Sequence, residues 1–321
     1  MFAMRGIAIS FSVFVILYSA LSVAVCGVWR RVWLGGPQYS ARRCADLLFA
    51  LRLAPFVVAA GVTFLLAVPS FLLLEPHTVD EPIGTVPVLL SLCGMTVLLV
   101  GVWKASAALV RASRNVAQWS TEGRASAPVL IDSVNSISVL RISGTAPPLT
   151  AAGILRPSVW LSRAAEFVLT ERELETALRH EVAHVRRRDN LRKLLLRLIA
   201  FPGMAELESA WREGTEMAAD DAAVSNASEA LDLAAAVIKW SRLAPLEPPA
   251  ELTTALVHSP AESVNARVER LIAWTERRQR PAPAYSLRFA LCAAATAVIT
   301  LALSYSQLLV RVHAATEWLV R

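Results

Sequence analysis

One stretch near the middle of the chain decides the fold of its polar part: residues 170–189 are TERELETALRHEVAHVRRRD. Thr170 is a favourable N-cap residue, and Glu173, three residues later, completes a capping box. Apolar residues then recur at helical spacing and predict a buried stripe, formed by Leu174, Leu178, Val182 and Val185. We therefore expect one helix over residues 170–200.

The same helix carries two histidines one turn apart. His180 and His184 share a face, so both imidazoles can reach a single Zn²⁺ at about 2.0–2.1 Å. Glu181 is placed to contact zinc-bound water, whose pKa falls to about 7, and to take its proton as a general base. The pattern is H-E-x-x-H, which predicts zinc-dependent peptide hydrolysis. The alternative is a pair of structural histidines, but chance gives this pattern in only about one such sequence in a few hundred.

A catalytic zinc site needs a third protein ligand and one open position. None of the other histidines has a suitable context, so we expect a carboxylate from a second helix over residues 206–224. On it Glu216 and Asp220 are one turn apart, a spacing that suits one ligand and one acceptor for the second N–H of an imidazole. Glu213 and Asp221 are competing candidates, and a solvated acidic face is the alternative.

The rest of the chain is more apolar than a soluble domain. Of its 321 residues, 55% are hydrophobic and 18% are charged, against about a quarter charged in soluble domains. Four apolar runs reach the roughly 20 residues that a membrane-spanning helix needs, at about residues 7–28, 53–74, 83–102 and 289–310. The net charge of +6 has no nucleic-acid-binding motif behind it, so we expect no direct nucleic-acid binding.

The arginines orient these spans. Five arginines and one aspartate lie between the first and second runs, whereas the loop between the second and third contains acidic residues and no lysine or arginine. More basic residues flank the polar block on both sides. The positive-inside rule therefore predicts that the first loop and the polar block face the cytoplasm and that both termini lie outside.

The domain organisation follows from these boundaries. We expect an α+β fold with three transmembrane helices in residues 1–110, a polar domain in residues 111–287, and a fourth span with a short external tail in residues 288–321. Short β-branched runs between turn residues predict strands at residues 128–131, 137–142 and 158–161. From Thr170 onward the pattern is helical, and the prolines at 245–249 indicate a bend.

Residues 180–189, followed by the sequence EMAADD at 216–221, resemble the M56 family of peptidases, the BlaR and MecR type of membrane sensor-transducer. Residues 153–161 and the order of spans resemble this family as well, over essentially the whole chain. The resemblance implies a gluzincin domain facing the cytoplasm of a bacterial inner membrane. It also implies zinc bound by His180, His184 and Glu216, a catalytic Glu181, and Asp220 as the partner of one imidazole.

Two features separate the chain from that pattern. Asp189 matches a family position, but on a straight helix it would point almost opposite His180, which favours a structural role. Receptors of this type also carry an extracellular penicillin-binding domain after the fourth span, and residues 312–321 are too few for one. We therefore expect no antibiotic sensing by acylation. The implied activity is site-specific cleavage of a cytoplasmic protein, such as a DNA-binding repressor or the protease itself.

Two other functions fit the same residues. A membrane quality-control protease of the M48 type shares the spans and the motif but usually arranges them differently. A catalytically silent scaffold could retain the zinc fold, although a scaffold would not need Glu181. For stabilising the oxyanion of the tetrahedral intermediate, Tyr285 and His258 are the candidates. The oligomeric state is not determined by these patterns.

Overall fold

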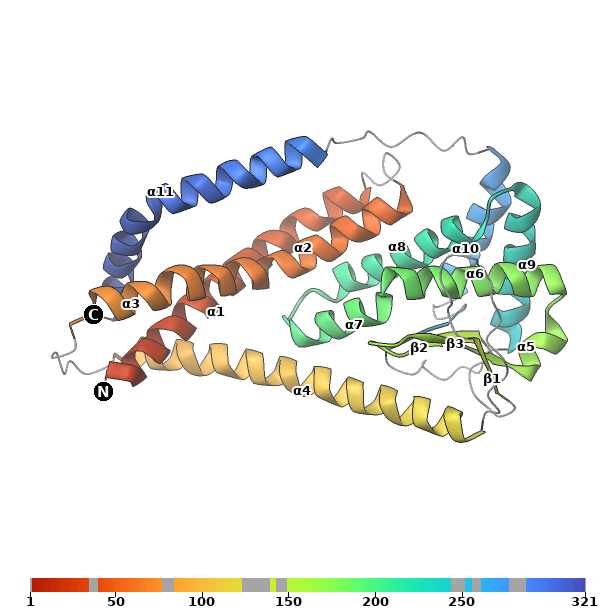
Figure 1. The fold of residues 1–321 in the computed structure, drawn as a ribbon, viewed down its shortest axis with the longest axis horizontal. Coiled ribbons are helices and arrows are strands. Elements are labelled where there is room, and N and C mark those ends of the chain that lie inside the picture. The colour runs from red at the N-terminus through yellow and green to blue at the C-terminus, as the bar shows by residue number, and fades with distance from the viewer. Residues whose placement is uncertain are drawn as a thin grey trace.

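The structure is a computed structural model that describes residues 2–34, 40–76, 84–122, 139–142, 149–243, 252–255, 261–276 and 287–320. Long apolar helices form one end of the molecule, and shorter helices with a small sheet form the other (Figure 1). The long helices are α1 (Phe2–Leu34), α2 (Ala41–Val62), α4 (Thr85–Glu122) and α11 (Leu287–Val320), and the short α3 (Val68–Leu74) continues α2. A π-helical turn at Thr63–Ala67 joins α2 to α3.

Three helical segments are long and apolar enough to cross a membrane: Phe2–Arg31, Ala41–Leu74 and Thr85–Ser120. They contain the first two predicted spans and residues 85–102 of the third, and they extend beyond these predicted bounds. At 1.5 Å per residue, 34 residues reach about 51 Å, which is longer than the roughly 30 Å hydrocarbon core of a bilayer. The fourth predicted span lies within α11 and stays a prediction.

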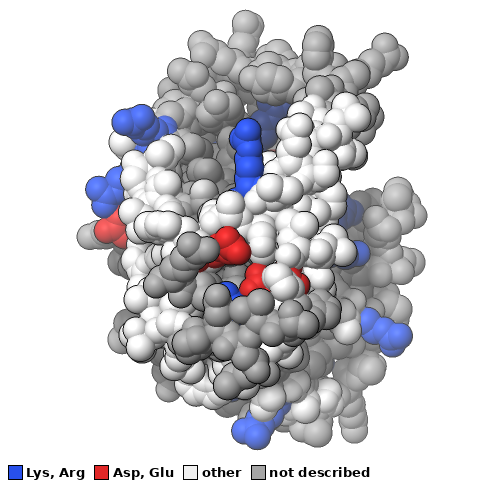
Figure 2. Space-filling view, turned by 90° about the vertical axis from the view of Figure 1, so that its left-hand side faces the viewer, with Lys and Arg blue, Asp and Glu red and all other residues white. Residues whose placement is uncertain are grey.

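The end that carries both termini shows a largely uncharged described surface, with acidic side chains gathered near its centre (Figure 2). At this end Arg5 of α1 pairs with Glu75, the residue that follows α3, with an N–O distance of 3.0 Å. His313 of α11 lies 3.9 Å from the same carboxylate. The polar domain lies at the opposite end of the long helices (Figure 1).

The sheet contains four strands in the order β1-β3-β2-β4. They are β1 (Val139–Ile142), β2 (Leu149–Ala152), β3 (Ser158–Ser162) and β4 (Thr253–Ala255); β1 and β3 are parallel, and the other pairs are antiparallel. The strand predicted at 158–161 is confirmed, and that at 137–142 is confirmed for its described part. The strand predicted at 128–131 and the proline-rich bend at 245–249 lie outside the described residues. Strand β2 was not predicted, because Leu-Thr-Ala-Ala has weak β-propensity.

The domain helices are α5 (Arg163–Val168), α6 (Glu171–Arg187), α7 (Asp189–Leu198), α8 (Ala205–Ala223), α9 (Ala227–Leu243) and α10 (Ala261–Ile272). The capping box at the start of α6 is confirmed. The single helix predicted over residues 170–200 is wrong, because Arg188 adopts a left-handed conformation (φ 54°) that ends α6 and starts α7. The second predicted helix, 206–224, is confirmed as α8.

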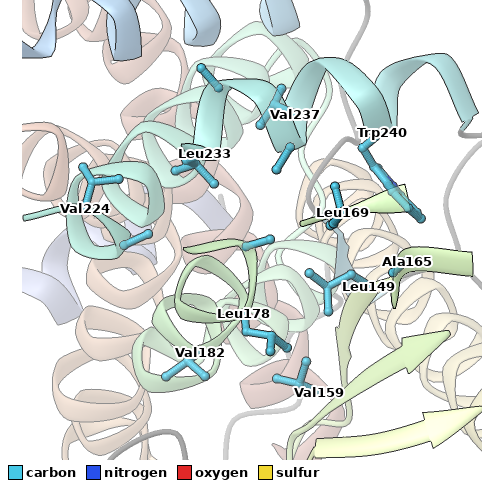
Figure 3. Close-up of a cluster of buried hydrophobic side chains, with 14 of the residues drawn as sticks. Leu149, Val159, Ala165, Leu169, Leu178, Val182, Val224, Leu233, Val237 and Trp240 are labelled. Carbon is cyan, nitrogen blue, oxygen red and sulfur yellow. The ribbon is translucent and has the colours of Figure 1, made fainter. Parts of the chain in front are cut away.

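Helix α6 lies on one face of the sheet, and α9 packs against α6 (Figure 3). Leu178 and Val182 of the predicted stripe are buried in this core, while Leu174 and Val185 are partly buried. On the other face of the sheet Trp160 contacts Trp119 near the end of α4, with ring centroids 5.9 Å apart. The sheet is therefore held between α6, which carries the H-E-x-x-H pattern, and α4, a candidate membrane span.

Helices α7 and α8 attach the domain to the long helices. The hydroxyl of Tyr18 donates to the Ile199 carbonyl at 2.7 Å, and the Arg52 guanidinium donates to the same oxygen at 2.7 Å. Gly101 of α4 approaches so closely that an added Cβ would lie 2.0 Å from the Leu198 carbonyl oxygen. The loop after α7 is thus packed between candidate membrane helices.

Candidate metal centre

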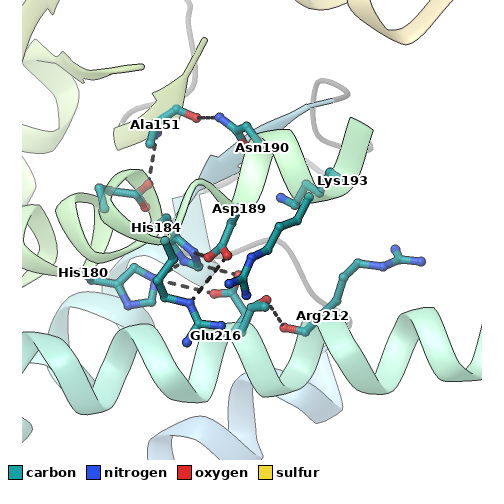
Figure 4. A network of polar contacts seen from close by, with 12 residues as sticks. Ala151, His180, His184, Asp189, Asn190, Lys193, Arg212 and Glu216 are labelled. Atoms are coloured by element: carbon teal, nitrogen blue, oxygen red, sulfur yellow. Dashed lines mark hydrogen bonds and ion pairs between the residues drawn. The ribbon is translucent and has the colours of Figure 1, made fainter. Parts of the chain in front are cut away.

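The two histidines of the motif face each other inside the domain (Figure 4). Their Nε2 atoms are 3.2 Å apart, and both side chains are almost fully buried. The Nδ1 atom of His180 lies 3.0 Å from Asp220 Oδ1, and that of His184 lies 2.7 Å from Asp189 Oδ2. Each imidazole therefore has a carboxylate behind it, hydrogen-bonded to His184 and at ion-pair distance from His180, with Nε2 directed at the shared point.

Glu216 supplies the third group at this point. Its carboxylate oxygens lie 3.5 Å from His180 Nε2 and 3.6 Å from His184 Nε2. Helix α8 brings Glu216 here by packing against α6. Ligand bonds of about 2.0–2.2 Å at tetrahedral angles would place ligand atoms about 3.3–3.6 Å apart. The observed spacing therefore fits a small tetrahedral cation.

The chemistry of these donors also fits a cation. When each Nδ1 carries a hydrogen that it donates to a carboxylate, the lone pair of each neutral imidazole lies on Nε2. Two such lone pairs and a carboxylate then meet in a buried space and repel one another unless a cation lies between them. His180, His184 and Glu216 consequently form a group that could hold a metal ion.

Glu181, between the histidines, is fully buried and directed at the sheet. Its Oε2 accepts a hydrogen bond from the backbone N–H of Ala151 in β2 at 3.0 Å. The side chain of Asn190 donates to the Ala151 carbonyl at 3.1 Å and so ties β2 to α7. The position of Glu181 is therefore set by the sheet as well as by its own helix.

Arg267 is a component of the site that the sequence analysis missed. It lies on α10, is 1% exposed, and donates from Nη2 and Nε to the two carboxylate oxygens of Asp220 at 2.7 and 2.9 Å. Its Nη1 lies 3.1 Å from Glu216 Oε2. A signal existed, because Arg267 occupies a stripe of apolar positions at helical spacing, with Val264, Val268 and Leu271.

These charges shift the pKa values of the group. Burial lowers the pKa of His180, but hydrogen bonds to Asp220 and Glu216 outweigh this effect and raise it to about 9. Burial raises the pKa values of Glu216 and Asp220, but the positive charges of Arg267 and the histidines outweigh it and hold both well below their usual range. Both carboxylates are therefore ionised at neutral pH, and a metal ion would displace a proton from His180.

Asp189 requires a correction. The structural role expected for it assumed a straight helix, whereas the break at Arg188 turns the Asp189 carboxylate toward His184. Burial raises the pKa of Asp189, but the contact with His184 outweighs burial and lowers it. Asp189 thus holds His184 in the way that Asp220 holds His180.

The competing candidates lie elsewhere. Asp221 binds Arg270 with both carboxylate oxygens at 2.6 Å, and Glu213 is not part of the metal-binding group. Tyr285 and His258 lie outside the described residues. Among the parts of the chain that are described, a second possible metal-binding group occurs at the opposite end, formed by Glu75, His313 and Glu317.

Comparison with known protein families and curated proteins identifies no relative of this chain. No protein-family model matches the chain, and no curated protein matches it. The resemblance to the M56 family remains an expectation from the sequence. Function is therefore inferred from the residues of the site.

Proposed function

We propose that this protein is an integral membrane zinc-dependent endopeptidase. The observation that supports it is the convergence of His180, His184 and Glu216, whose ligand atoms lie within 4.8 Å of one another in a buried space. A zinc ion, when bound there, supplies a Lewis acid that polarises a peptide carbonyl and acidifies water. The H-E-x-x-H pattern on α6 favours zinc hydrolase chemistry over a purely structural site.

The residues around the candidate metal site have separate roles in proton transfer and in positioning. Glu181 acts as general base, taking a proton from the attacking water and passing it to the amine that leaves. The Ala151 N–H holds one oxygen of this carboxylate and so limits its rotation. Asp220 and Asp189 keep the imidazoles in the tautomer that presents Nε2, and Arg267 holds Glu216 and Asp220 in place.

The decisive test is Glu181→Gln in the full-length protein. We expect the variant to retain its zinc content, measured by mass spectrometry of the metal, and to lose proteolysis by about 10²–10⁴-fold, the usual contribution of a general base. Sequencing of newly formed protein N-termini in cells would reveal the cleaved substrate. Glu175→Gln is the matched control, because Glu175 lies on the same helix but is exposed and pairs with Arg179.

Two results would refute the enzymatic assignment. One is full substrate processing by Glu181→Gln with normal zinc content. The other is the absence of any difference in N-termini between cells with the wild-type protein and cells with the variant, which would favour a scaffold that retains the zinc fold.

The proposed location is the bacterial inner membrane, with the polar domain in the cytoplasm. Its support is the arginine distribution together with the three candidate spans. The substrate is then a cytoplasmic protein, such as a repressor, or the protease itself. A reporter that is active only in the cytoplasm should be active when fused after Arg114 and inactive when fused after Asp80; the reverse pattern would overturn this orientation.

A further inference from the structure

A cavity lies where α2, α6, α7 and α8 meet. Its volume is about 640 Å³, within the range of about 300–1,000 Å³ that small-molecule sites occupy. None of the three candidate metal ligands lines it. Its lining instead contains one acidic residue, Asp46, and six arginines: Arg42, Arg179, Arg186, Arg187, Arg188 and Arg192.

Arg187 is the central observation. Its side chain is 9% exposed, and its Nε, Nη1 and Nη2 atoms are buried without a hydrogen-bond partner among the described residues. The nearest carboxylates, Asp46 at 3.6 Å and Asp189 at 3.5 Å, lie within ionic range but beyond hydrogen-bond geometry. A guanidinium has five N–H donors, and leaving buried donors unsatisfied is unfavourable.

The two nearby carboxylates are already engaged elsewhere. Asp46 accepts from Arg192 at 2.7 Å, and Asp189 lies 2.7 Å from His184. Asp189 makes that contact through Oδ2, and its Oδ1, 3.5 Å from Arg187 Nε, has no hydrogen-bond partner, so a small adjustment would satisfy Nε. The Nη1 and Nη2 donors of Arg187 are left without a hydrogen-bond acceptor among the described residues.

The charge of the cavity indicates what that acceptor is. Of its six arginines, Arg179 pairs with Glu175 and Glu229, and Arg192 pairs with Asp46. Arg42, Arg187 and Arg188 add further positive charge to the cavity, and arginine forks match the oxygens of a phosphate group. We propose that this arginine pocket binds a phosphate group, carried by a soluble phosphate ester or by the headgroup of an anionic phospholipid.

The position of the pocket makes both sources accessible. Arg42 and Asp46 lie in the first two turns of the candidate span Ala41–Leu74, at the end nearest the polar domain. Basic clusters beside the cytoplasmic end of a membrane helix attract anionic lipid headgroups. Arg42 and Arg188 are also exposed, so a soluble ester can enter from the solvent.

The test uses full-length protein with two probes. Inorganic phosphate is titrated against thermal unfolding in detergent at constant ionic strength, and retained lipid is measured by native mass spectrometry after exchange into micelles containing phosphatidylglycerol or phosphatidylcholine. Arg187→Gln and Arg42→Gln are compared with Arg114→Gln, an exposed arginine on α4 outside the cavity. Arg42→Gln is included because it removes an exposed side chain and should fold even if Arg187→Gln does not.

We expect the two pocket variants to bind one of the probes about tenfold more weakly, as the loss of a charge-assisted hydrogen bond implies, and Arg114→Gln to bind it as the wild type does. If inorganic phosphate stabilises the wild type more than the two pocket variants, the ligand is a soluble phosphate ester. If the wild type retains phosphatidylglycerol but not phosphatidylcholine, and the two pocket variants retain less phosphatidylglycerol, the ligand is an anionic lipid headgroup. The proposal is overturned if neither probe binds, or if all three variants bind as the wild type does.

Discussion

Asp189 Oδ2 lies 2.7 Å from Nδ1 of His184, although a straight helix would carry the two side chains apart. The contact exists because Arg188 adopts a left-handed conformation between them, so that α7 leaves α6 in a new direction. The far end of α7 reaches Gly101 of α4, where the Leu198 carbonyl meets the glycine backbone. One short helix therefore joins a candidate membrane span to the candidate metal centre.

Removing this carboxylate should weaken metal binding. We expect Asp189→Ala to lower zinc affinity by about 10–100-fold, the usual effect of losing the partner that orients a metal-binding imidazole. Competition with a chromophoric chelator measures this affinity. Asp232→Ala, on α9, is the control and should bind zinc normally. Normal affinity in Asp189→Ala would show that the contact does not orient His184.

The two arginines of α10 provide a matched pair for measuring burial. Arg267 and Asp220 are at most 2% exposed, whereas Arg270 and Asp221 are 15% and 28% exposed. We expect Arg267→Met to destabilise the metal-free protein by about 3–5 kcal/mol, because it leaves buried carboxylates without a counter-charge. Arg270→Met should cost about 1 kcal/mol or less. Equal losses in thermal or denaturant unfolding would contradict this burial argument.

Gly101 should tolerate no side chain. A Cβ there would meet the Leu198 carbonyl oxygen at 2.0 Å, so Gly101→Ala must displace α7 or α4 and should cost about 1–3 kcal/mol. Gly27→Ala, on α1, is the control because nothing lies within 4 Å of its added Cβ. Alanine is also the better helix former, so this control should unfold at or above the wild-type temperature. A wild-type unfolding temperature for Gly101→Ala would disprove the close approach.

The start of α6 should make stability depend on pH. Glu173 is buried, which raises its pKa, but Lys239 and the Thr170 backbone N–H outweigh burial and lower it. A lowered folded-state pKa stabilises the protein above the unfolded-state value of about 4.3, and this contribution is lost as pH falls through the folded-state pKa.

Glu173→Gln is the corresponding test. It should be less stable than the wild type by a constant amount between pH 5 and 7, and the difference should shrink below a pH of about 4.3. Unfolding of metal-free protein across this range measures the difference. Glu171→Gln, on the same first turn but exposed, serves as the control. A difference that grows on acidification would reverse the sign assigned to the pKa shift.

Local patterns in the sequence were sufficient to predict part of the candidate site. The spacing of His180 and His184 determines a shared helix face, and the period of α8 places Glu216 and Asp220 on one side of their helix. The lengths of the apolar runs likewise predicted the three candidate spans. These features depend on residues within a few turns of one another, where helix geometry alone relates sequence to position.

The positions of the other site residues depend on tertiary contacts between segments that are distant in the sequence. Asp189 reaches His184 only because one residue takes a left-handed conformation, and Arg267 reaches Asp220 from 47 positions away along the chain. The arginines around Arg187 come together from α2, α6 and α7. Periodicity cannot show such contacts, because it records which face of a helix is buried and not which side chain lies against that face.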